Sequence, residues 1–281
     1  TRAMAGRASR MARNATWWDG VAELHGSTEL YRASEARLRR GGTTLSPEEL
    51  RLAGDLKGAR LLHVGCHLGH DSISWARRGA VVTALDFSAE ALANASRLAQ
   101  ELGEDVAFLH SEATDLPTTL SGHFDVVVAS RGVYPWMPDL DAWAREVARC
   151  LTPGGRFVLV DGHPLLHALA DQAFDGESVR LVRPLLAGAP QQLSASGSYA
   201  DRSMETPVRD RTAWCHGVGD LFMAITRAGM QVDHLEEGTT APWQRFAALR
   251  KDQGGFRLPE RWDGQLPLAL SIRATKPKDT A

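Results

Sequence analysis

Short apolar runs alternate with helical patterns between residues 58 and 162, and this alternation restricts the fold more than any other feature of the chain. The runs that predict strands are 60–65, 80–86, 106–110, 124–130 and 156–161. The stretches that predict helices are 71–78, 89–102 and 139–151. Strands that alternate with helices form a parallel sheet with helices on both faces. The sequence therefore predicts an α/β fold.

The alternation breaks after the fifth strand. Residues 163–217 contain four prolines and a stretch rich in Gln, Ser and Gly at 191–198, which indicates an insertion above the sheet. The pattern returns with a helix near 219–228 and strands at 230–236 and 268–273. We find no internal repeat, so the chain reads as one interrupted sheet.

Composition and charge exclude several classes of protein. The 32 basic and 34 acidic side chains nearly balance, whereas nucleic-acid binding needs an excess of Lys and Arg. No apolar run approaches the ~20 residues that span a bilayer. Cys66, Cys150 and Cys215 are odd in number, far apart and outside any metal-ligand spacing. We therefore expect no disulfide framework, no metal site and a cytoplasmic location, with no nucleic-acid or membrane partner.

The segment 65–69, Gly-Cys-His-Leu-Gly, joins the first predicted strand to the first predicted helix. Ligands of open α/β sheets bind at the carboxyl ends of the strands, beside the first strand. Gly65 and Gly69 allow the backbone to approach such a ligand. Asp86 ends the second strand, where an acid accepts both hydroxyls of a ribose, and Phe87 is placed to pack on a purine. This combination predicts a nucleoside-containing ligand.

Two classes of nucleoside ligand compete for this loop. A dinucleotide requires the pattern G-x-G-x-x-G, with its pyrophosphate at the helix N-terminus. His67 replaces the middle glycine of that pattern and leaves little room for a pyrophosphate. S-adenosylmethionine carries no phosphate and is compatible with the bulkier loop.

Five ordered motifs resemble those of the class I S-adenosylmethionine-dependent methyltransferases. They lie at 61–69, 82–88, 124–127, 151–157 and 242–246. More narrowly, the chain is similar to an actinobacterial-type subgroup with a Cys-His-x-Gly loop, a Trp-x-Pro-Asp-Leu stretch at 136–140 and a His-Pro pair at 163–164. The broad family usually carries three glycines in the loop, and this chain shares the subgroup's departure from that pattern. The resemblance covers roughly residues 17–275.

The resemblance implies a Rossmann-like three-layer sandwich with a seven-stranded, mainly parallel sheet in the order 3-2-1-4-5-7-6, the last strand antiparallel. It implies S-adenosylmethionine as the cofactor. Gly65, Cys66 and Gly69 would face its methionine part, His67 would contact the cofactor from the same loop, and Asp86 would bind its ribose. The residues implied around the adenine are Phe87, Glu112 and Ala113, and those implied on the methionine and substrate side are Ser130 and Arg131.

The domain organisation follows from the same alignment of motifs. We expect one domain over residues 17–276. A flexible tail at 1–16, which holds four arginines and no acid, is expected to precede it. Its parts are lid helices at 17–57, a cofactor-binding core at 58–162, a substrate-cap insertion at 163–217 and the rest of the sheet at 218–276. The assembly is expected to be a monomer or a homodimer.

Methyl transfer to a nucleophile is an in-line displacement at a sulfonium, so alignment supplies much of the rate. A base is needed only where the nucleophile starts protonated. His163, just beyond the fifth strand, and His216, before the late helix, are candidate bases because an imidazole titrates near neutral pH. Tyr134 and Tyr199 are hydroxyl-bearing alternatives. Each of these side chains also has a purely structural interpretation.

Aromatic residues gather in the N-terminal segment and the predicted loops. Together they favour a binding wall for a small-molecule specialised metabolite that is aromatic or nitrogen-heterocyclic, such as an indole. The residues expected in this wall are Trp17, Trp18, Tyr31, Trp136, Tyr199, Trp214 and Trp243. The competing interpretation is that these rings attach the insertion to the sheet.

Three other functions remain open at this point. A cyclase or lyase acting on S-adenosylmethionine would release methylthioadenosine rather than S-adenosylhomocysteine. A non-catalytic module would bind the cofactor without turnover. An NAD-dependent oxidoreductase would need the glycine that His67 replaces.

Overall fold

A seven-stranded sheet forms the centre of the computed structural model, which describes residues 2–174, 178–186, 188, 190–252 and 254–278. Its strands are β1 (Arg60–Val64), β2 (Val81–Asp86), β3 (Val106–His110), β4 (Phe124–Ser130), β5 (Leu151–Gly162), β10 (Gln231–Gly238) and β13 (Ala269–Thr275). They lie in the order β3-β2-β1-β4-β5-β13-β10, and β13 runs antiparallel to both neighbours. Counted along the chain this is the order 3-2-1-4-5-7-6, as the resemblance implied.

Helices cover both faces of the sheet, which explains why its central strands are apolar throughout. On one face α3 (Pro47–Ala53), α4 (His70–Arg77) and α5 (Ala89–Leu102) pack against Leu61 and Val128. On the other face α6 (Leu140–Cys150) and α8 (Val218–Arg227) pack against Leu62 and Val127. Neighbouring residues of one strand therefore enter opposite cores, and the three layers follow from the sequence pattern.

The strand and helix bounds agree with the sequence analysis to within two residues for most elements, and β5 is the exception. Its predicted start was residue 156, after a Pro-Gly-Gly turn, yet the strand begins at Leu151. Phe124 pairs with Leu151 and Val126 pairs with Arg156, so residues 152–155 form a wide bulge within the strand. Gly154 supplies the positive φ of 79° that this bulge requires.

The expected flexible tail at 1–16 was wrong, because α1 extends over Arg2–His25. Ala and Arg are strong helix formers, and the absence of acids in this segment does not oppose a helix. Met11 and Asn14 are buried. The Asn14 side chain donates to the carbonyl of Thr212 and accepts from its amide, both at 2.8 Å. The part of α1 around Met11 and Asn14 is therefore a packed part of the domain.

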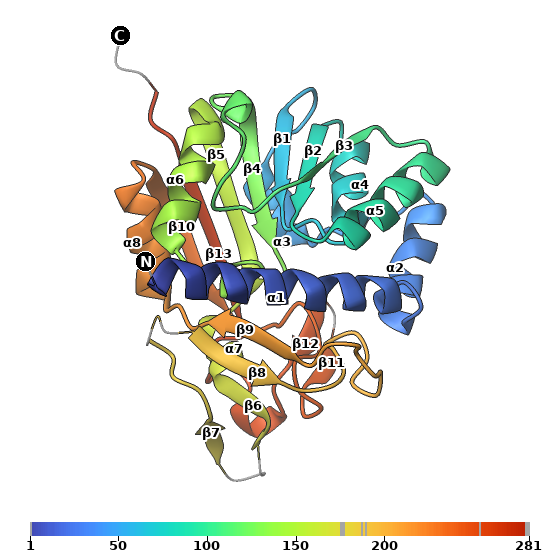
Figure 1. Ribbon diagram of the computed structural model, residues 1–281, viewed down its shortest axis with the longest axis vertical. Helices are drawn as coiled ribbons and strands as arrows, with labels where there is room; N and C mark the ends of the chain where they lie inside the picture. Colours follow the sequence, from blue (N-terminus) through green and yellow to red (C-terminus); the bar gives the residue numbers. More distant parts are fainter. Residues whose placement is uncertain (1, 175–177, 187, 189, 253, 279–281) are drawn as a thin grey trace.

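The insertion after β5 contains regular structure that showed no readable periodicity. Its elements are α7 (Pro164–Ala168), β6 (Leu169–Phe174), β7 (Val179–Leu181), β8 (Pro190–Ser194) and β9 (Asp210–Trp214). β6 pairs with β7 and β8 pairs with β9, each pair antiparallel. Helix α1 runs across one end of the sheet strands, between them and the β8–β9 hairpin (Figure 1). The insertion thus covers the end of the sheet together with α1.

The remaining elements connect these parts. They are α2 (Glu29–Arg39), β11 (Arg250–Asp252), β12 (Gly255–Arg257) and the short 3₁₀ helices η1 (Thr118–Leu120), η2 (Tyr134–Trp136) and η3 (Glu260–Trp262). The β11–β12 hairpin lies in the segment between β10 and β13, where the sequence had indicated a loop. Within the described ranges, every helix is too short or too polar to cross a membrane.

Replacing Asn14 by Ala tests the attachment of α1 to the insertion. The variant leaves the buried amide and carbonyl of Thr212 without their partner, which we expect to lower the free energy of unfolding by about 2 kcal/mol. Chemical denaturation followed by circular dichroism measures the change. Arg13→Ala, at an exposed position of the same helix, is the control and is expected to unfold like the wild type. Equal stability of Asn14→Ala and wild type would contradict this role for Asn14.

Candidate functional site

A cavity of about 570 Å³ lies where the carboxyl ends of β1 and β4 meet α1 and the insertion. Its volume is in the usual range for small-molecule sites. Of the residues expected to bind cofactor, Gly65, Cys66, His67, Ser130 and Arg131 line it. All seven residues expected in the aromatic wall line it as well, namely Trp17, Trp18, Tyr31, Trp136, Tyr199, Trp214 and Trp243. The structure therefore brings the two predicted groups together around one space.

The cofactor loop is shaped by packing beneath it as well as by the cavity above. Gly65 has a φ of 72°, and a Cβ there would lie 2.7 Å from the Val133 side chain. Gly69 has a φ of 74°, and its Cβ would lie 2.7 Å from Ala95 on α5. Gly69 does not line the cavity, so close helix packing is the reason for a glycine at this position.

Asp86 lies directly beneath the loop, at the end of β2. Its carboxylate accepts hydrogen bonds from the amides of His67 at 2.8 Å and Ser88 at 3.0 Å. Burial raises the pKa of this carboxyl, and the backbone donors oppose the rise. Asp86 holds the loop in place and keeps unused acceptor capacity on both oxygens.

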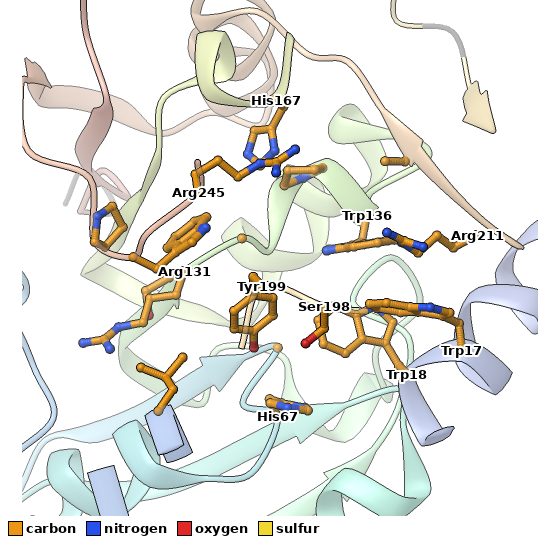
Figure 2. Close-up of a pocket in the computed structure, with 18 of the residues that line it drawn as sticks. Trp17, Trp18, His67, Arg131, Trp136, His167, Ser198, Tyr199, Arg211 and Arg245 are labelled. Carbon is orange, nitrogen blue, oxygen red and sulfur yellow. The ribbon is translucent and has the colours of Figure 1, made fainter. Parts of the chain in front are cut away.

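The expected ribose and adenine side of the site lies outside the cavity. Asp86, Phe87, Glu112 and Ala113 are absent from its lining, and Ala113 belongs to the core against β4. Tyr199 of the insertion lies in the middle of the cavity, above His67 (Figure 2). Burial is the main cause that raises the pKa of Tyr199 to about 12, and the charge of Asp86 contributes. Tyr199 of the insertion thus occupies the space above the cofactor loop.

Among the candidate bases, Tyr199 lines this cavity, whereas His163, His216 and Tyr134 do not and each has a structural partner elsewhere. His163 caps α7 by accepting from the Leu165 amide at 3.0 Å, and its Nε2 lies 2.7 Å from Glu237. His216 Nε2 donates to the carbonyl of Met137 at 2.7 Å. Tyr134 donates to the carbonyl of Gly162 at 2.8 Å. Each of these side chains has a structural partner here, and the expectation that one of them removes a proton from the substrate stays a prediction.

A buried hydrogen-bond chain, which the sequence analysis missed, joins α1, the cofactor loop and the insertion. His25 Nδ1 lies 2.8 Å from His67 Nε2, and His25 Nε2 lies 2.8 Å from Ser198 Oγ. Burial lowers the pKa of His25 to about 3 and that of His67 well below its usual value. Both rings are therefore neutral near pH 7, and the chain fixes the lid on the loop without adding charge.

Two carboxylates fix the loop that follows β4, and neither was predicted. Asp161, fully buried at the end of β5, accepts from the amides of Gly132 at 2.6 Å and Val133 at 2.9 Å, and burial raises its pKa to about 7. Asp71, on α4, forms an ion pair of 3.2 Å with Arg131. Asp161 ends a predicted strand, as Asp86 does. The same sequence feature that singled out Asp86 could therefore have singled out Asp161.

The aromatic wall is a packed array of indoles. Trp17 stacks on Trp136 with ring centroids 5.8 Å apart, and Trp18 meets both rings edge-on at 5.0 and 5.3 Å. The guanidinium of Arg211 lies 4.5 Å from the Trp17 ring (Figure 2). The indole nitrogens of Trp17 and Trp18 are buried without a hydrogen-bond partner among the described residues. The array gives the cavity a flat apolar side next to a cation.

Glu48, His234 and Glu236 are the group with metal-ligand spacing in the described part of the chain. They do not line the cavity. Arg51 forms ion pairs with Glu48 at 2.5 Å and Glu236 at 3.7 Å, which supplies the positive charge that these acids need. The group is a surface ion-pair network beside the sheet.

Acidification tests the buried His25. Its folded pKa of about 3 lies below the ordinary value of 6.5, so the unfolded chain binds the proton more readily. The stability that neutral His25 contributes to the fold is complete above pH 6.5 and is lost as the pH falls toward 3. Between pH 7 and pH 5 the free energy of unfolding falls for the wild type because His25 resists protonation in the fold. We expect this fall to be about 2 kcal/mol smaller for His25→Phe. Denaturant titrations at both pH values measure this, with the exposed His123→Phe as control. Identical pH slopes for His25→Phe and wild type would refute it.

Comparisons with known proteins agree with this geometry. A family model described as a methyltransferase domain matches residues 62–157. The ubiquinone biosynthesis O-methyltransferase of Xanthomonas euvesicatoria pv. vesicatoria is 33% identical over 233 residues, which cover 83% of each chain. The fatty-acid O-methyltransferase of Mycolicibacterium smegmatis is 33% identical over 197 residues, 66% of each chain.

A solved structure shows the same fold. The S-adenosylmethionine-dependent methyltransferase of Mesorhizobium loti superposes with a TM-score of 0.55 at 22% identity, covering 80% of this chain and 94% of the other. The extent of the Xanthomonas match, the sheet order and the position of the loop after β1 lead to one conclusion. The chain belongs to the class I S-adenosylmethionine-dependent methyltransferases.

Proposed function

We propose that this enzyme methylates a small molecule with a flat aromatic or nitrogen-heterocyclic body, of which an indole is the model case. The observation that carries the proposal is the Trp17–Trp136 stack, which shares one cavity with the cofactor loop. A flat ring gains both burial and ring stacking against such a surface. The names of the Xanthomonas and Mycolicibacterium relatives favour oxygen as the methyl acceptor. The Cys-His-x-Gly loop is proposed to mark a subgroup that shares this site.

The residues present fit the cofactor. The loop at Gly65, Cys66 and His67 exposes its backbone to the cavity, and the Asp86 carboxylate beneath it retains lone pairs for two ribose hydroxyls. We assign Phe87, Glu112 and Ala113 to the adenine, and Ser130 and Arg131 to the methionine end. When bound, S-adenosylmethionine supplies a methyl group already activated by the sulfonium.

The chain itself contributes orientation and exclusion of water. The carboxylate of Asp161 fixes the loop after β4, and the hydrogen bonds of His25 fix the lid on the opposite side. Alignment between these two rigid walls is the main source of rate acceleration in this scheme. His25 and His67, both neutral at pH 7 because burial lowers their pKa, are poor proton acceptors. The scheme therefore uses neither His25 nor His67 as the base, and a protonated acceptor such as a phenol needs another group to take its proton.

Calorimetric titration with S-adenosylmethionine, S-adenosylhomocysteine and NAD tests the cofactor assignment. We expect micromolar binding of the first two and none of NAD, because the loop carries His67 where a pyrophosphate would lie. Release of S-adenosylhomocysteine on a panel of phenols, indoles and aromatic acids then tests the transfer. Release of methylthioadenosine instead would identify a lyase or cyclase. Turnover restricted to acyclic acceptors would overturn the aromatic assignment.

Asp86→Asn tests the ribose contact. The variant keeps one acceptor for the loop amides but loses the charge, and we expect affinity for S-adenosylhomocysteine to fall about tenfold or more. Asp125→Asn, at the amino end of β4 where it pairs with Arg60, is the matched control and keeps wild-type affinity. Thermal unfolding of both variants separates loss of contact from loss of fold. Unchanged affinity in Asp86→Asn would remove Asp86 from the cofactor site.

A further inference from the structure

The cavity is lined by more basic than acidic side chains. Asp71 is the single acid in the lining among the described residues, and its charge is matched by Arg131 at 3.2 Å. The arginines that line the cavity are Arg131, Arg183, Arg202, Arg211 and Arg245. Apart from Asp71, which pairs with Arg131, no acid among the described lining residues offsets Arg183 and Arg211.

Two of these arginines keep hydrogen-bonding capacity. Arg183 donates to the carbonyl of His167 at 2.9 Å. Arg211 donates to the carbonyls of Ala195 and Arg209, both at 3.1 Å. Neither forms an ion pair with a carboxylate in the part of the chain that the structure describes. Each guanidinium has five N–H donors, so both retain donors for a further acceptor.

Arg183 and Arg211 both belong to the insertion and line the same cavity. Burial lowers the pKa of Arg211, and the positive charge of Arg183 lowers it further. The charge of Arg183, together with that of Arg245, also lowers the pKa of the buried His167 to about 3, where burial is again the larger cause. Two like charges held together and partly buried are unfavourable unless an anion joins them.

Their position separates them from the cofactor loop. Arg211 lies on β9 beside Trp17 and Trp136, whereas Arg131 lies on the other side of Tyr199 (Figure 2). Arg183 contacts the carbonyl of His167, which follows β5. Arg211 therefore borders the aromatic wall, where the acceptor is proposed to bind, and Arg183 lines the same cavity.

We infer that the substrate carries a carboxylate or phosphate, held by Arg183 and Arg211, on a flat body that packs against Trp17 and Trp136. Arginine suits this task because its planar fork matches both anions in a bidentate geometry. The inference rests on the proposed function and narrows its substrate class to aromatic acids or aromatic phosphates. The competing occupant is the methionine carboxylate of the cofactor, which the experiment separates.

The experiment measures binding of matched probes to the protein saturated with S-adenosylhomocysteine, and to the protein alone, by calorimetry. Indole-3-acetate is compared with indole-3-acetamide, and phenyl phosphate with benzyl alcohol. We expect one anion to bind about tenfold or more tighter than its neutral partner, and to weaken as salt rises. Which anion binds tighter identifies the carboxylate or the phosphate as the group recognised.

Variants assign the effect to the two arginines. Arg211→Gln and Arg183→Gln are each expected to lower the affinity for the anionic probe about tenfold. The affinities for the neutral probe and for S-adenosylhomocysteine are expected to stay unchanged. Arg211→Lys keeps the charge and recovers part of the affinity. Arg209→Gln, exposed and adjacent to the same hairpin, is the control and binds the anion like the wild type. Retained binding of S-adenosylhomocysteine shows that each variant is folded.

Several outcomes overturn the inference. Equal affinity for acid and amide, or no binding of either anionic probe, excludes an anion site. An equal loss in Arg209→Gln assigns the effect to the general field of the protein. Loss of S-adenosylhomocysteine binding in Arg211→Gln, with the anionic probe unaffected, assigns Arg211 to the cofactor. If the wild type binds the anion through these arginines but never the cofactor, the proposed function fails and the anion site stands.

Discussion

Helix α1 is attached on both sides of the cavity, and the site depends on these two attachments. Toward the sheet, Asp19 accepts a hydrogen bond of 2.6 Å from Ser88, the residue that caps α5. Toward the insertion, Asn14 pairs with both backbone groups of Thr212. Trp17 and Trp18 lie between these anchors and face the cavity. Without α1 the sheet would end in an open groove, and the rings of the wall would lose the helix that carries two of them.

Buried charge is arranged differently on the two sides of this space. Near the cofactor loop, Asp86 and Asp161 accept hydrogen bonds from backbone amides and Asp71 pairs with Arg131, so each of these acids has a partner within the protein. On the insertion side, Arg183 and Arg211 donate to carbonyl oxygens, which leave their charge uncompensated. Because unpaired buried charge is costly, this contrast points to a ligand that completes the second side.

The sequence was sufficient for the sheet, because each central strand is apolar on both faces and each helix has a cap or a stop at its predicted end. Gly65, Ser130 and the seven aromatic residues were also located at the cavity. His163, His216 and Tyr134 were not, since a histidine that caps a helix and one that binds substrate look alike in sequence. His25, Ser198 and Arg211 escaped notice because their contacts join segments far apart along the chain.

The residues on the two sides of the cavity come from different parts of the chain, and this has an evolutionary consequence. The loop after β1 and the acid after β2 belong to the continuous sheet core, whereas Arg183, Tyr199 and Arg211 all come from the excursion between β5 and α8. Substitutions in that excursion leave the sheet register untouched, and they reach the cofactor loop through contacts such as that of Ser198 with His25. The two halves of the site are therefore free to diverge at different rates, and new acceptors can be acquired by drift in the excursion so long as Thr212 still meets Asn14.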